Sequence, residues 1–420
     1  MKKLIIILIL FSIVSCATKT SKYLTSNDTN NSKQTEDKPY VLLISIDGYR
    51  WDYTEKYSPK FLTNFMKTGS SVKSLRPSYP TKTFPNHLSI ITGRYPMNHG
   101  IIGNRFYAPS IDRSYSLRDR SAIEDTRFYT AKPLWVLAEE QGMKTATYFW
   151  PGSEAKIDGS FPSYYLKYNH GTPHDERINT VLKWFKMPKE KRPHFATLYF
   201  HDVDSAGHNY GPNASETEAA VHKVDKSIER LVHELNKLNL PLNIVIVSDH
   251  GMAELDEKNV ELIGKSKKVK TNLESFKIVG KGPLVHFYRS NSSFKYVTRT
   301  MNLINKNAKH FKCYKKNKTP KYLNFRKNKR IGDFVCIADR GWSISHEPKS
   351  IPKGNHGWSQ FEGTDMHSIL YAKGPNFKSA FKQGTVNNID IYPMLAKILD
   401  LKIEHEIDGK IKNTMPLIKE

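Results

Sequence analysis

The side chains best suited to chemistry lie in five short clusters of acidic, histidine and threonine residues, spread between residues 47 and 356. They offer seven oxygen and nitrogen ligands: Asp47, Thr83, Asp204, His208, Asp249, His250 and His356. Catalytic zinc is bound by histidine and carboxylate ligands, with one position kept open for water or substrate. Two such ions beside a nucleophile need about this many ligands. The clusters therefore predict a two-metal hydrolytic centre, if the fold brings them together.

Three of the clusters directly follow compact apolar runs. Tyr40 to Ile46, Phe195 to Phe200 and Leu242 to Val247 are typical of buried parallel strands, and Ser368 to Ala372 is a further strand candidate. Helical patterns lie between the runs: Pro59 to Lys67, Pro85 to Thr92, Lys132 to Gln141, Asp175 to Phe185, Glu216 to Leu238 and Ile389 to Leu399. This alternation predicts an α/β sheet with helices on both faces. Ligands of such sheets gather beyond the carboxyl ends of the strands, where these clusters are expected.

Thr83 is the candidate nucleophile. Pro85 is suited to the first turn of a helix, which would leave Thr83 at the helix N-terminus. The backbone N–H groups and the helix dipole there favour an anion such as a phosphoryl group. A threonine hydroxyl is a weak nucleophile and needs a base or a metal. Taken alone, Thr83 also fits an ordinary helix cap, and Thr81 is a nearby competitor.

The spacing of the acid–histidine pairs gives further expectations. Asp204 and His208 are four residues apart, so on a helical turn they would lie on the same side. Asp249 and His250 are adjacent and would need a bent strand end to reach one ion. Asp202 is a rival to Asp204, although the spacing to His208 favours Asp204. Any one of these histidines, taken alone, is more often a core residue than a metal ligand.

Six segments together carry a family resemblance. PTKTFPNH, GIIGNRFY, YFWPGSE, DSAGHNYGP, VSDHG and GNHGW, in this order, closely resemble the nucleotide pyrophosphatase/phosphodiesterase family of the alkaline-phosphatase superfamily. The resemblance extends from Tyr40 to about Leu401. It implies an alkaline-phosphatase-like fold: a mostly parallel central sheet with helices on both faces, and a small inserted α+β cap region.

The resemblance also implies two Zn²⁺ ions per chain and a role for each cluster. One zinc would be held by Asp47, Thr83, Asp249 and His250, and the other by Asp204, His208 and His356. Thr83, ionised by its metal, would attack phosphorus and form a phosphothreonine, which water activated at the other zinc would hydrolyse. Asn104 would donate to a phosphate oxygen; otherwise it is a turn residue beside Gly103.

The same resemblance points to nucleotides as substrates. Phe84 and Tyr168 match an aromatic pair that would sandwich a nucleobase, although core packing is the alternative. Relatives that cleave lysophospholipids lack a stretch after the Asn motif, whereas here Ala108 to Thr130 is present and polar. Nucleoside triphosphates, dinucleotides and nucleotide esters would be cleaved to nucleoside 5′-monophosphates.

Rival functions stay open at this stage. A glycerophosphodiester or choline head-group phosphodiesterase would use the same ligand set, and the chain could also be a non-catalytic surface binding protein that retains its metal. A phosphomonoesterase is less favoured, because neither a phosphate-clamping Arg motif nor a third metal site is evident in the sequence.

The N-terminus predicts export. Residues 1–16 combine Lys2 and Lys3, an apolar run and the lipobox-like sequence IVSC, typical of a lipoprotein signal peptide with lipid attachment at Cys16. Ala17 after that cysteine favours the outer membrane if the source has one. Residues 17–38 are polar and predict a flexible tether. Residues 39–420 would form a single catalytic domain with an insertion at about 255–340.

The chain has 420 residues and a net charge of +24, much of it in residues 265–270 and 309–330. We expect no specific nucleic-acid recognition, because no DNA- or RNA-binding motif is visible. A basic surface would still attract anionic substrates or a negatively charged envelope. Cys313 and Cys336 could form one disulfide in an oxidising compartment or remain two thiols.

Overall fold

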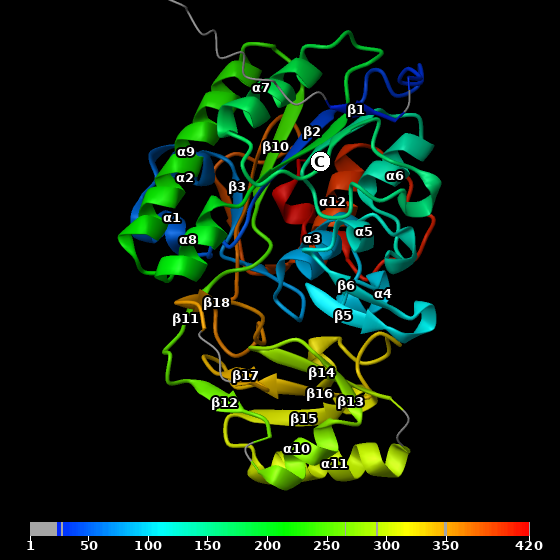
Figure 1. The fold of residues 1–420 in the computed structure, drawn as a ribbon. Coiled ribbons are helices and arrows are strands. Elements are labelled where there is room, and N and C mark those ends of the chain that lie inside the picture. The colour runs from blue at the N-terminus through cyan, green and yellow to red at the C-terminus, as the bar shows by residue number, and fades with distance from the viewer. Residues whose placement is uncertain (1–22, 27, 265, 291–292, 348–350, 420) are drawn as a thin grey trace, which may run out of the picture.

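A nine-stranded sheet runs through the larger of two lobes (Figure 1). The computed structural model describes residues 23–26, 28–264, 266–290, 293–347 and 351–419. In spatial order the strands are β1 (Leu24–Thr25), β8 (Tyr164–Leu166), β7 (Thr145–Tyr148), β9 (Phe195–Phe200), β2 (Tyr40–Ile46), β10 (Leu242–Val247), β19 (Leu370–Lys373), β3 (Ser70–Val72) and β20 (Phe381–Gln383). Five of the eight neighbouring pairs are parallel; β1–β8, β10–β19 and β19–β3 are antiparallel. The predicted α/β class with a mostly parallel central sheet is confirmed.

Helices bury both faces of this sheet. One face packs against α1 (Tyr53–Tyr57), α2 (Lys60–Thr68), α7 (His174–Phe185), α8 (Asp202–Tyr210) and α9 (Ser215–Asn236). The other packs against α3 (Thr83–Thr92), α6 (Leu134–Glu140) and α12 (Ile391–Ile398), with the short helices α4 (Pro96–His99) and α5 (Arg120–Ile123) near α3 (Figure 1). Side chains of a strand alternate between faces, so β2 contributes Val41 and Leu43 to one core and Leu42 and Ile44 to the other. This is why its sequence is apolar throughout.

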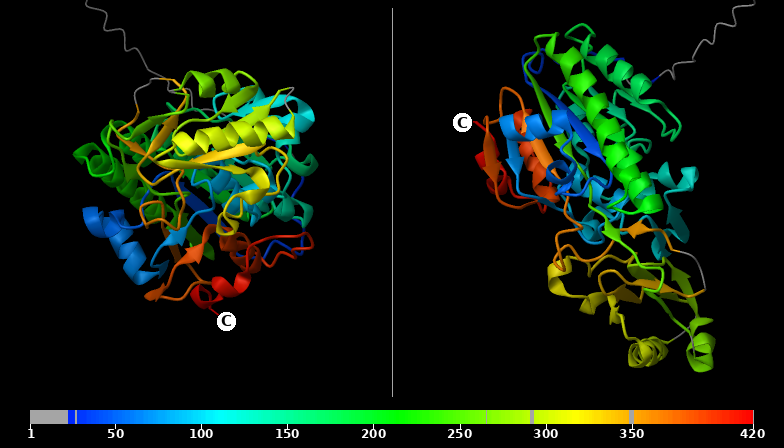
Figure 2. Two further views of the ribbon diagram at one scale, coloured as in Figure 1. Left: turned by 90° about the horizontal axis from the view of Figure 1, so that it is seen from below. Right: turned by 90° about the vertical axis from the view of Figure 1, so that its left-hand side faces the viewer.

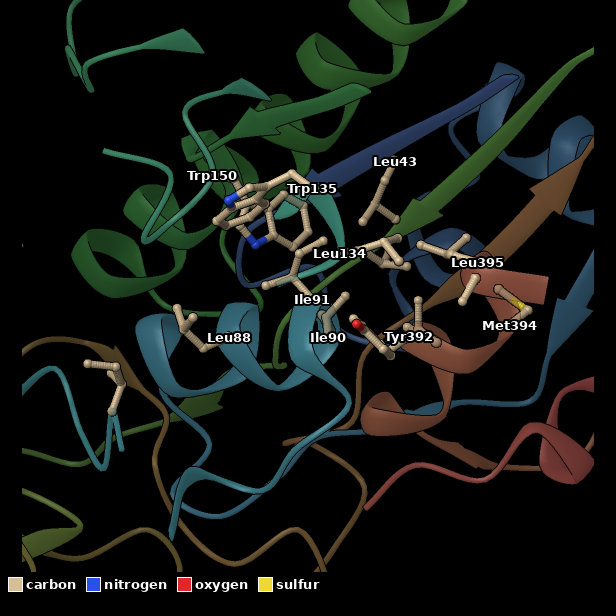
Figure 3. Packing of buried hydrophobic residues seen from close by; sticks show 14 of the residues in the cluster. Leu43, Leu88, Ile90, Ile91, Leu134, Trp135, Trp150, Tyr392, Met394 and Leu395 are labelled. Carbon is tan, nitrogen blue, oxygen red and sulfur yellow. The ribbon is translucent and has the colours of Figure 1, made fainter. Parts of the chain in front are cut away.

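The core behind α3 fixes the position of that helix. Figure 3 shows its labelled side chains lying close together: Leu43, Leu88, Ile90, Ile91, Leu134, Trp135, Trp150, Tyr392, Met394 and Leu395. They come from the sheet, α3, α6, α12 and the loop after β7. Every α3 residue from Pro85 to Thr92 is buried. Packing of these residues therefore fixes the position of α3, while its N-terminus lies near the carboxyl ends of the central strands.

The boundaries of three central strands agree with the sequence prediction, whereas those of α3, α6 and β19 differ from it. Strands β2, β9 and β10 begin and end as predicted. Helix α3 begins at Thr83, two residues before the predicted start. Helix α6 begins only at Leu134, because Pro133 is extended at its N-cap. The last predicted strand starts at Leu370, since Ser368 forms only an isolated bridge with Leu75.

The smaller lobe contains a second sheet, covered on one side by two helices (Figures 1 and 2). Its order is β13 (Phe276–Val279), β14 (Leu284–Arg289), β16 (Phe334–Ala338) and β15 (Phe311–Lys315), with all neighbours antiparallel. Helices α10 (Lys267–Leu273) and α11 (Phe294–Asn307) share its hydrophobic core. Cys313 and Cys336 are opposite each other on β15 and β16 and form a disulfide.

Short elements complete the fold. The strand pairs are the hairpin β5 (Arg105–Ala108) and β6 (Arg113–Ser116), β4 (Leu75–Arg76) with β21 (Val386–Asn387), β11 (Ala253–Glu254) with β18 (Gly354–Asn355), and β12 (Val260–Leu262) with β17 (Ser343–Ser345). The 3-10 segments are Pro109–Ile111, Thr126–Phe128, Ile157–Gly159, Lys316–Lys318, Lys321–Leu323, Asn388–Asp390, Ile411–Asn413 and Met415–Leu417.

A buried arginine joins the two lobes. The Arg330 guanidinium donates to the backbone carbonyls of Gly100 at 2.8 Å and Arg127 at 2.6 Å, and also to that of Phe128. Beside it the Tyr288 hydroxyl accepts from the Tyr107 backbone N–H at 3.2 Å. The orientation of the smaller lobe is thus fixed by hydrogen bonds to the chain segments on either side of Asn104.

The described part of the predicted tether packs on the larger lobe. Strand β1 pairs with β8 at the edge of the central sheet. The buried Asn31 side chain donates to the carbonyls of Lys189 (3.0 Å) and Arg192 (2.8 Å) and accepts from the Lys144 N–H (2.7 Å). The polar composition of residues 17–38 suggested a flexible segment, but in its described part polar side chains make the contacts that apolar side chains would otherwise make.

The predicted signal peptide, Cys16 and residues 17–22 of the tether lie outside the described residues. Within the ranges that the structure does describe, no helix combines the length and the apolar character needed to cross a bilayer.

Replacing Asn31 tests the packing of this segment. Asn31→Ala would leave two carbonyls and one N–H without the partner that the buried Asn31 side chain supplies, so we expect the free energy of unfolding to fall by about 2 kcal/mol in urea titrations. Gln34→Ala, a neighbouring exposed position, is the matched control and should change little. Equal midpoints for the two variants would mean that the segment is a loose tether after all.

Candidate active site

Thr83 begins helix α3 and lies beside a metal-ligand candidate. Its hydroxyl forms no helix cap, and its Oγ1 is 3.3 Å from His250 Nε2. The competitor Thr81 is fully buried; it donates to the Trp358 carbonyl at 2.9 Å and accepts from the Gly357 N–H at 2.8 Å. The Thr81 hydroxyl is therefore fully used in structure, which leaves Thr83 as the available one.

Two groups of ligand candidates converge at the carboxyl ends of β2, β9 and β10. Asp47, Asp249 and His250 form the first, with His250 Nε2 at 3.4 Å from Asp47 Oδ1 and 3.0 Å from Asp249 Oδ2. Asp204, His208 and His356 form the second: His208 Nε2 is 3.5 Å and His356 Nε2 is 3.7 Å from Asp204 Oδ1. The six acidic and histidine ligand candidates of the sequence are thus brought together beside Thr83, the seventh.

The three histidines present the same nitrogen to the site. Each Nδ1 faces a backbone carbonyl: His208 that of Gly354 at 2.7 Å, His250 that of Gly251 at 2.8 Å, and His356 that of Thr81 at 2.7 Å. A carbonyl only accepts, so each Nδ1 carries the proton and each Nε2 presents a lone pair. His208 Nε2 and His356 Nε2 are only 3.2 Å apart. Two lone pairs at that distance repel each other, and a cation between them would bind both.

The carboxylates show the same need for positive charge. Asp47 Oδ1, Asp204 Oδ1 and Asp249 Oδ2 are buried and have no hydrogen-bond donor among the described residues. Burial raises the pKa of Asp47 and of Asp249 well above the ordinary carboxyl range, and the neighbouring carboxylates add to the shift. Burial lowers the pKa of His250 and His356, which keeps both rings neutral. Oxygen and neutral imidazole donors without protons fit divalent metal ions.

The choice between Asp202 and Asp204 is decided by the direction of the two side chains on α8. Asp202 Oδ2 accepts from His174 Nε2 at 2.8 Å, and Asp202 Oδ1 accepts from Lys223 Nζ at 2.6 Å. Hydrogen bonds from His174 and Lys223 outweigh burial and hold the pKa of Asp202 well below its usual range. Asp202 is therefore satisfied on the outside of the helix, and Asp204 faces the site.

Gly48 allows α8 to approach β2 this closely. Its φ is +69°, and a Cβ there would lie 2.8 Å from the Cα of Asp204. Any other side chain at position 48 would therefore push Asp204 away from Asp47.

A cavity of about 400 Å³ opens over Thr83. Phe84 and Tyr168 both line it, as does Asn104, whose Oδ1 accepts from the Phe84 backbone N–H at 3.0 Å. The amide group of Asn104 is thereby oriented through its oxygen, which leaves its NH₂ for another acceptor. Four residues of the polar stretch 108–130 also line the cavity: Leu117, Arg118, Arg120 and Ile123.

Two supporting residues were not predicted. The Tyr199 hydroxyl on β9 donates to Asp47 Oδ2 at 2.5 Å. His87 on α3 donates from Nδ1 to the Thr83 carbonyl at 2.9 Å and accepts at Nε2 from the Ser45 hydroxyl at 2.8 Å. Burial lowers the pKa of His87 to about 3, so its ring stays neutral. His87 could have been noticed in PTKTFPNH, whereas nothing in the sequence distinguishes Tyr199 from other strand tyrosines.

Solved structures share the fold. Mouse ectonucleotide pyrophosphatase/phosphodiesterase 5, described as an inactive threonine-to-alanine variant in complex with AMP, superposes with a TM-score of 0.85 at 28% identity, covering 91% of this chain and 100% of that one. The human protein of the same name gives a TM-score of 0.84 at 29% identity, with the same coverage.

Similar sequences point to one family. Human ectonucleotide pyrophosphatase/phosphodiesterase family member 1 is 37% identical over 378 residues, which is 87% of this chain and 40% of the relative. A venom phosphodiesterase of Naja atra is 34% identical over 379 residues, 87% of this chain and 45% of the relative. The chain thus spans less than half the length of these relatives. Residues 41–359 match the profile described as "Type I phosphodiesterase / nucleotide pyrophosphatase". The chain therefore belongs to the nucleotide pyrophosphatase/phosphodiesterase family of the alkaline-phosphatase superfamily.

Proposed function

We propose that the protein is a two-zinc phosphodiesterase that hydrolyses nucleotide phosphodiester and pyrophosphate bonds to nucleoside 5′-monophosphates. The observation that carries the proposal is the position of the Thr83 hydroxyl: it lies at a helix N-terminus, beside the two ligand groups, on the wall of a cavity lined by Phe84 and Tyr168. Family membership supports the reaction class, because the relatives are named nucleotide pyrophosphatases and phosphodiesterases.

The residues divide the reaction into two displacements. Thr83 Oγ attacks phosphorus, the bond to the leaving group breaks, and a phosphothreonine remains. Water then attacks the same phosphorus, the bond to Thr83 breaks, and the monophosphate leaves. When bound, the metal ions supply Lewis acidity and lower the pKa of a hydroxyl or of water. Asn104 donates to a phosphate oxygen, and His87 positions Thr83 through its backbone carbonyl.

The ligand set would hold one ion with Asp47, Thr83, Asp249 and His250 and the other with Asp204, His208 and His356. Mixed nitrogen and oxygen donors suit zinc. The solved mouse relative supports the role of the threonine, because it is described as inactive when a threonine is replaced by alanine and as a complex with AMP.

We further propose that the protein is exported and attached to the membrane through a lipid on Cys16. The disulfide between Cys313 and Cys336 supports export, since disulfides persist in oxidising compartments.

Removing the Thr83 hydroxyl tests the nucleophile. We expect Thr83→Ala to lower kcat on a nitrophenyl ester of thymidine 5′-phosphate by about a thousandfold or more, because it removes the attacking oxygen. Thr81→Ser, which keeps both hydrogen bonds of Thr81, is the control and should retain activity. Substantial turnover by Thr83→Ala with normal zinc content would disprove the covalent route.

Asp202 and Asp204, two residues apart on α8, allow a matched test of the ligand set. Elemental analysis should find two zinc ions per wild-type chain and a chelator should abolish turnover, with recovery on adding zinc. Asp204→Asn should lose one ion, because it removes a ligand, whereas Asp202→Asn should keep both. Loss of one ion in Asp202→Asn but not in Asp204→Asn would mean that Asp202 is the ligand.

A substrate panel tests the nucleotide preference. We expect dinucleotides and nucleoside triphosphates to be cleaved with a higher kcat/KM than glycerophosphocholine. Tyr168→Ala should raise KM for the nucleotide ester about tenfold through lost base stacking, but should leave bis(nitrophenyl) phosphate hydrolysis nearly unchanged. Tyr322→Ala, an exposed tyrosine outside the cavity, is the control. Preference for glycerophosphocholine would indicate a head-group phosphodiesterase instead.

A further inference from the structure

The basic charge of the chain is concentrated in the smaller lobe. Residues 255–340 hold 22 Lys and Arg against 6 Asp and Glu, a net charge of +16 out of the total of +24. The catalytic lobe is therefore close to balanced for its size, and the Lys-rich composition is not a uniform property of the surface. A local excess of this size creates a field that attracts polyanions.

The outer face of this lobe is formed by α10 and α11. One side of the second sheet faces the larger lobe, and its Leu284 and Val335 belong to the same hydrophobic core as α3. The other side packs against the two helices. The solvent side of α10 and α11 is thus the end of the molecule most distant from the central sheet (Figures 1 and 2).

Helix α11 carries a basic stripe along its solvent side. Lys295, Arg299 and Lys306 are exposed and spaced four and seven residues apart, which places them on one side of the helix. The buried residues Val297 and Ile304 lie on the opposite side. On α10, Lys267, Lys268 and Lys270 are exposed around the buried Val269. We refer to these six basic residues as the basic face.

The positive charges of the basic face are not neutralised by acidic groups of the described residues. None of the six side chains is within 4.0 Å of an acidic group belonging to the described residues, although surface lysines elsewhere, such as Lys189 and Lys191, form ion pairs. Glu274, which follows α10, is the single acidic residue between positions 262 and 332. The field of the basic face therefore points outward.

An aromatic side chain borders the basic face. Phe294, the first residue of α11, is 67% exposed, and the Arg289 guanidinium lies 3.8 Å from the centre of its ring. Proteins that bind single-stranded nucleic acid without sequence preference combine such exposed rings with basic side chains, because bases stack on the rings and phosphates contact the cations. A bilayer is a poorer fit, because beyond Phe294 the solvent side of α11 offers polar residues only. Strand β1, the first described element after the proposed lipid attachment at Cys16, lies at the opposite end of the molecule from α11 (Figure 1).

We propose that the basic face binds single-stranded nucleic acid, independently of sequence and apart from the catalytic cavity. Binding comes from contacts between the six cations and backbone phosphates, with Phe294 stacking on a base. Because this surface is separate from Thr83 and the metal ligands, it goes beyond the proposed hydrolytic function and does not depend on it.

The test measures binding of a fluorescent oligothymidylate to the full mature protein in the Thr83→Ala background, so that turnover does not consume the probe. We expect affinity to fall steeply as salt rises. The quadruple variant K267E/K268E/K295E/R299E should weaken binding at least tenfold at low salt. It should also reduce the slope of log K against log salt by about three, as expected for four lost phosphate contacts. Phe294→Leu should weaken binding of the oligonucleotide but not of heparin.

The matched control K60E/K67E/K183E/K226E carries the same charge change on exposed residues of the catalytic lobe. It should bind the oligonucleotide nearly as the parent does. Equal loss in both quadruple variants would attribute binding to total charge and overturn the proposal. Binding of anionic phosphatidylglycerol vesicles, lost with the basic face while the oligonucleotide does not bind, would overturn it in favour of a membrane surface. With Thr83 restored, both quadruple variants should hydrolyse the nitrophenyl nucleotide ester at the parental rate, which shows that they fold.

Discussion

The structure depends on one electrostatic constraint: three carboxylates and three imidazole lone pairs are gathered in a buried volume with almost no donors. Without cations, such a cluster would be unstable, because burial and mutual repulsion both oppose ionisation of Asp47 and Asp249. The sheet, α3 and α8 hold these groups in place, and the large cores on both faces of the sheet provide the stability to do so. Metal binding and folding of this region are thus linked.

The orientation of the histidines comes from the backbone rather than from other side chains. His208, His250 and His356 each donate to a carbonyl of a loop or short strand next to the site. One carbonyl belongs to Thr81, two residues before the proposed nucleophile, so the loop that presents Thr83 also aims a ligand of the second group. The proposed nucleophile and the two groups of ligand candidates therefore form one connected unit, which is how a precise geometry is kept without a dense side-chain network.

Much of this could be predicted from the sequence, for identifiable reasons. Strands buried on both faces are continuous apolar runs, so β2, β9 and β10 were placed to the residue, and the clusters that follow them had to meet at one edge. Contacts made by ordinary residues left no such signal. The Tyr199 hydroxyl on Asp47, the outward direction of Asp202 and the packing of Asn31 depend on tertiary neighbours that no spacing reveals. The start of α3 at Thr83 likewise follows from the packing behind it.

The buried Arg330 has a consequence for how this protein can change. Its guanidinium joins the smaller lobe to the carbonyls of Gly100 and Arg127, which flank the Asn104 loop and the polar stretch over the cavity. The two sides of the smaller lobe are therefore structurally constrained to different degrees. The inner side forms part of the framework of the cavity and can tolerate few substitutions, whereas the outer helices can exchange charge freely without disturbing catalysis. A lineage could thus acquire or lose an affinity for polyanions through surface drift alone, while its chemistry stayed constant.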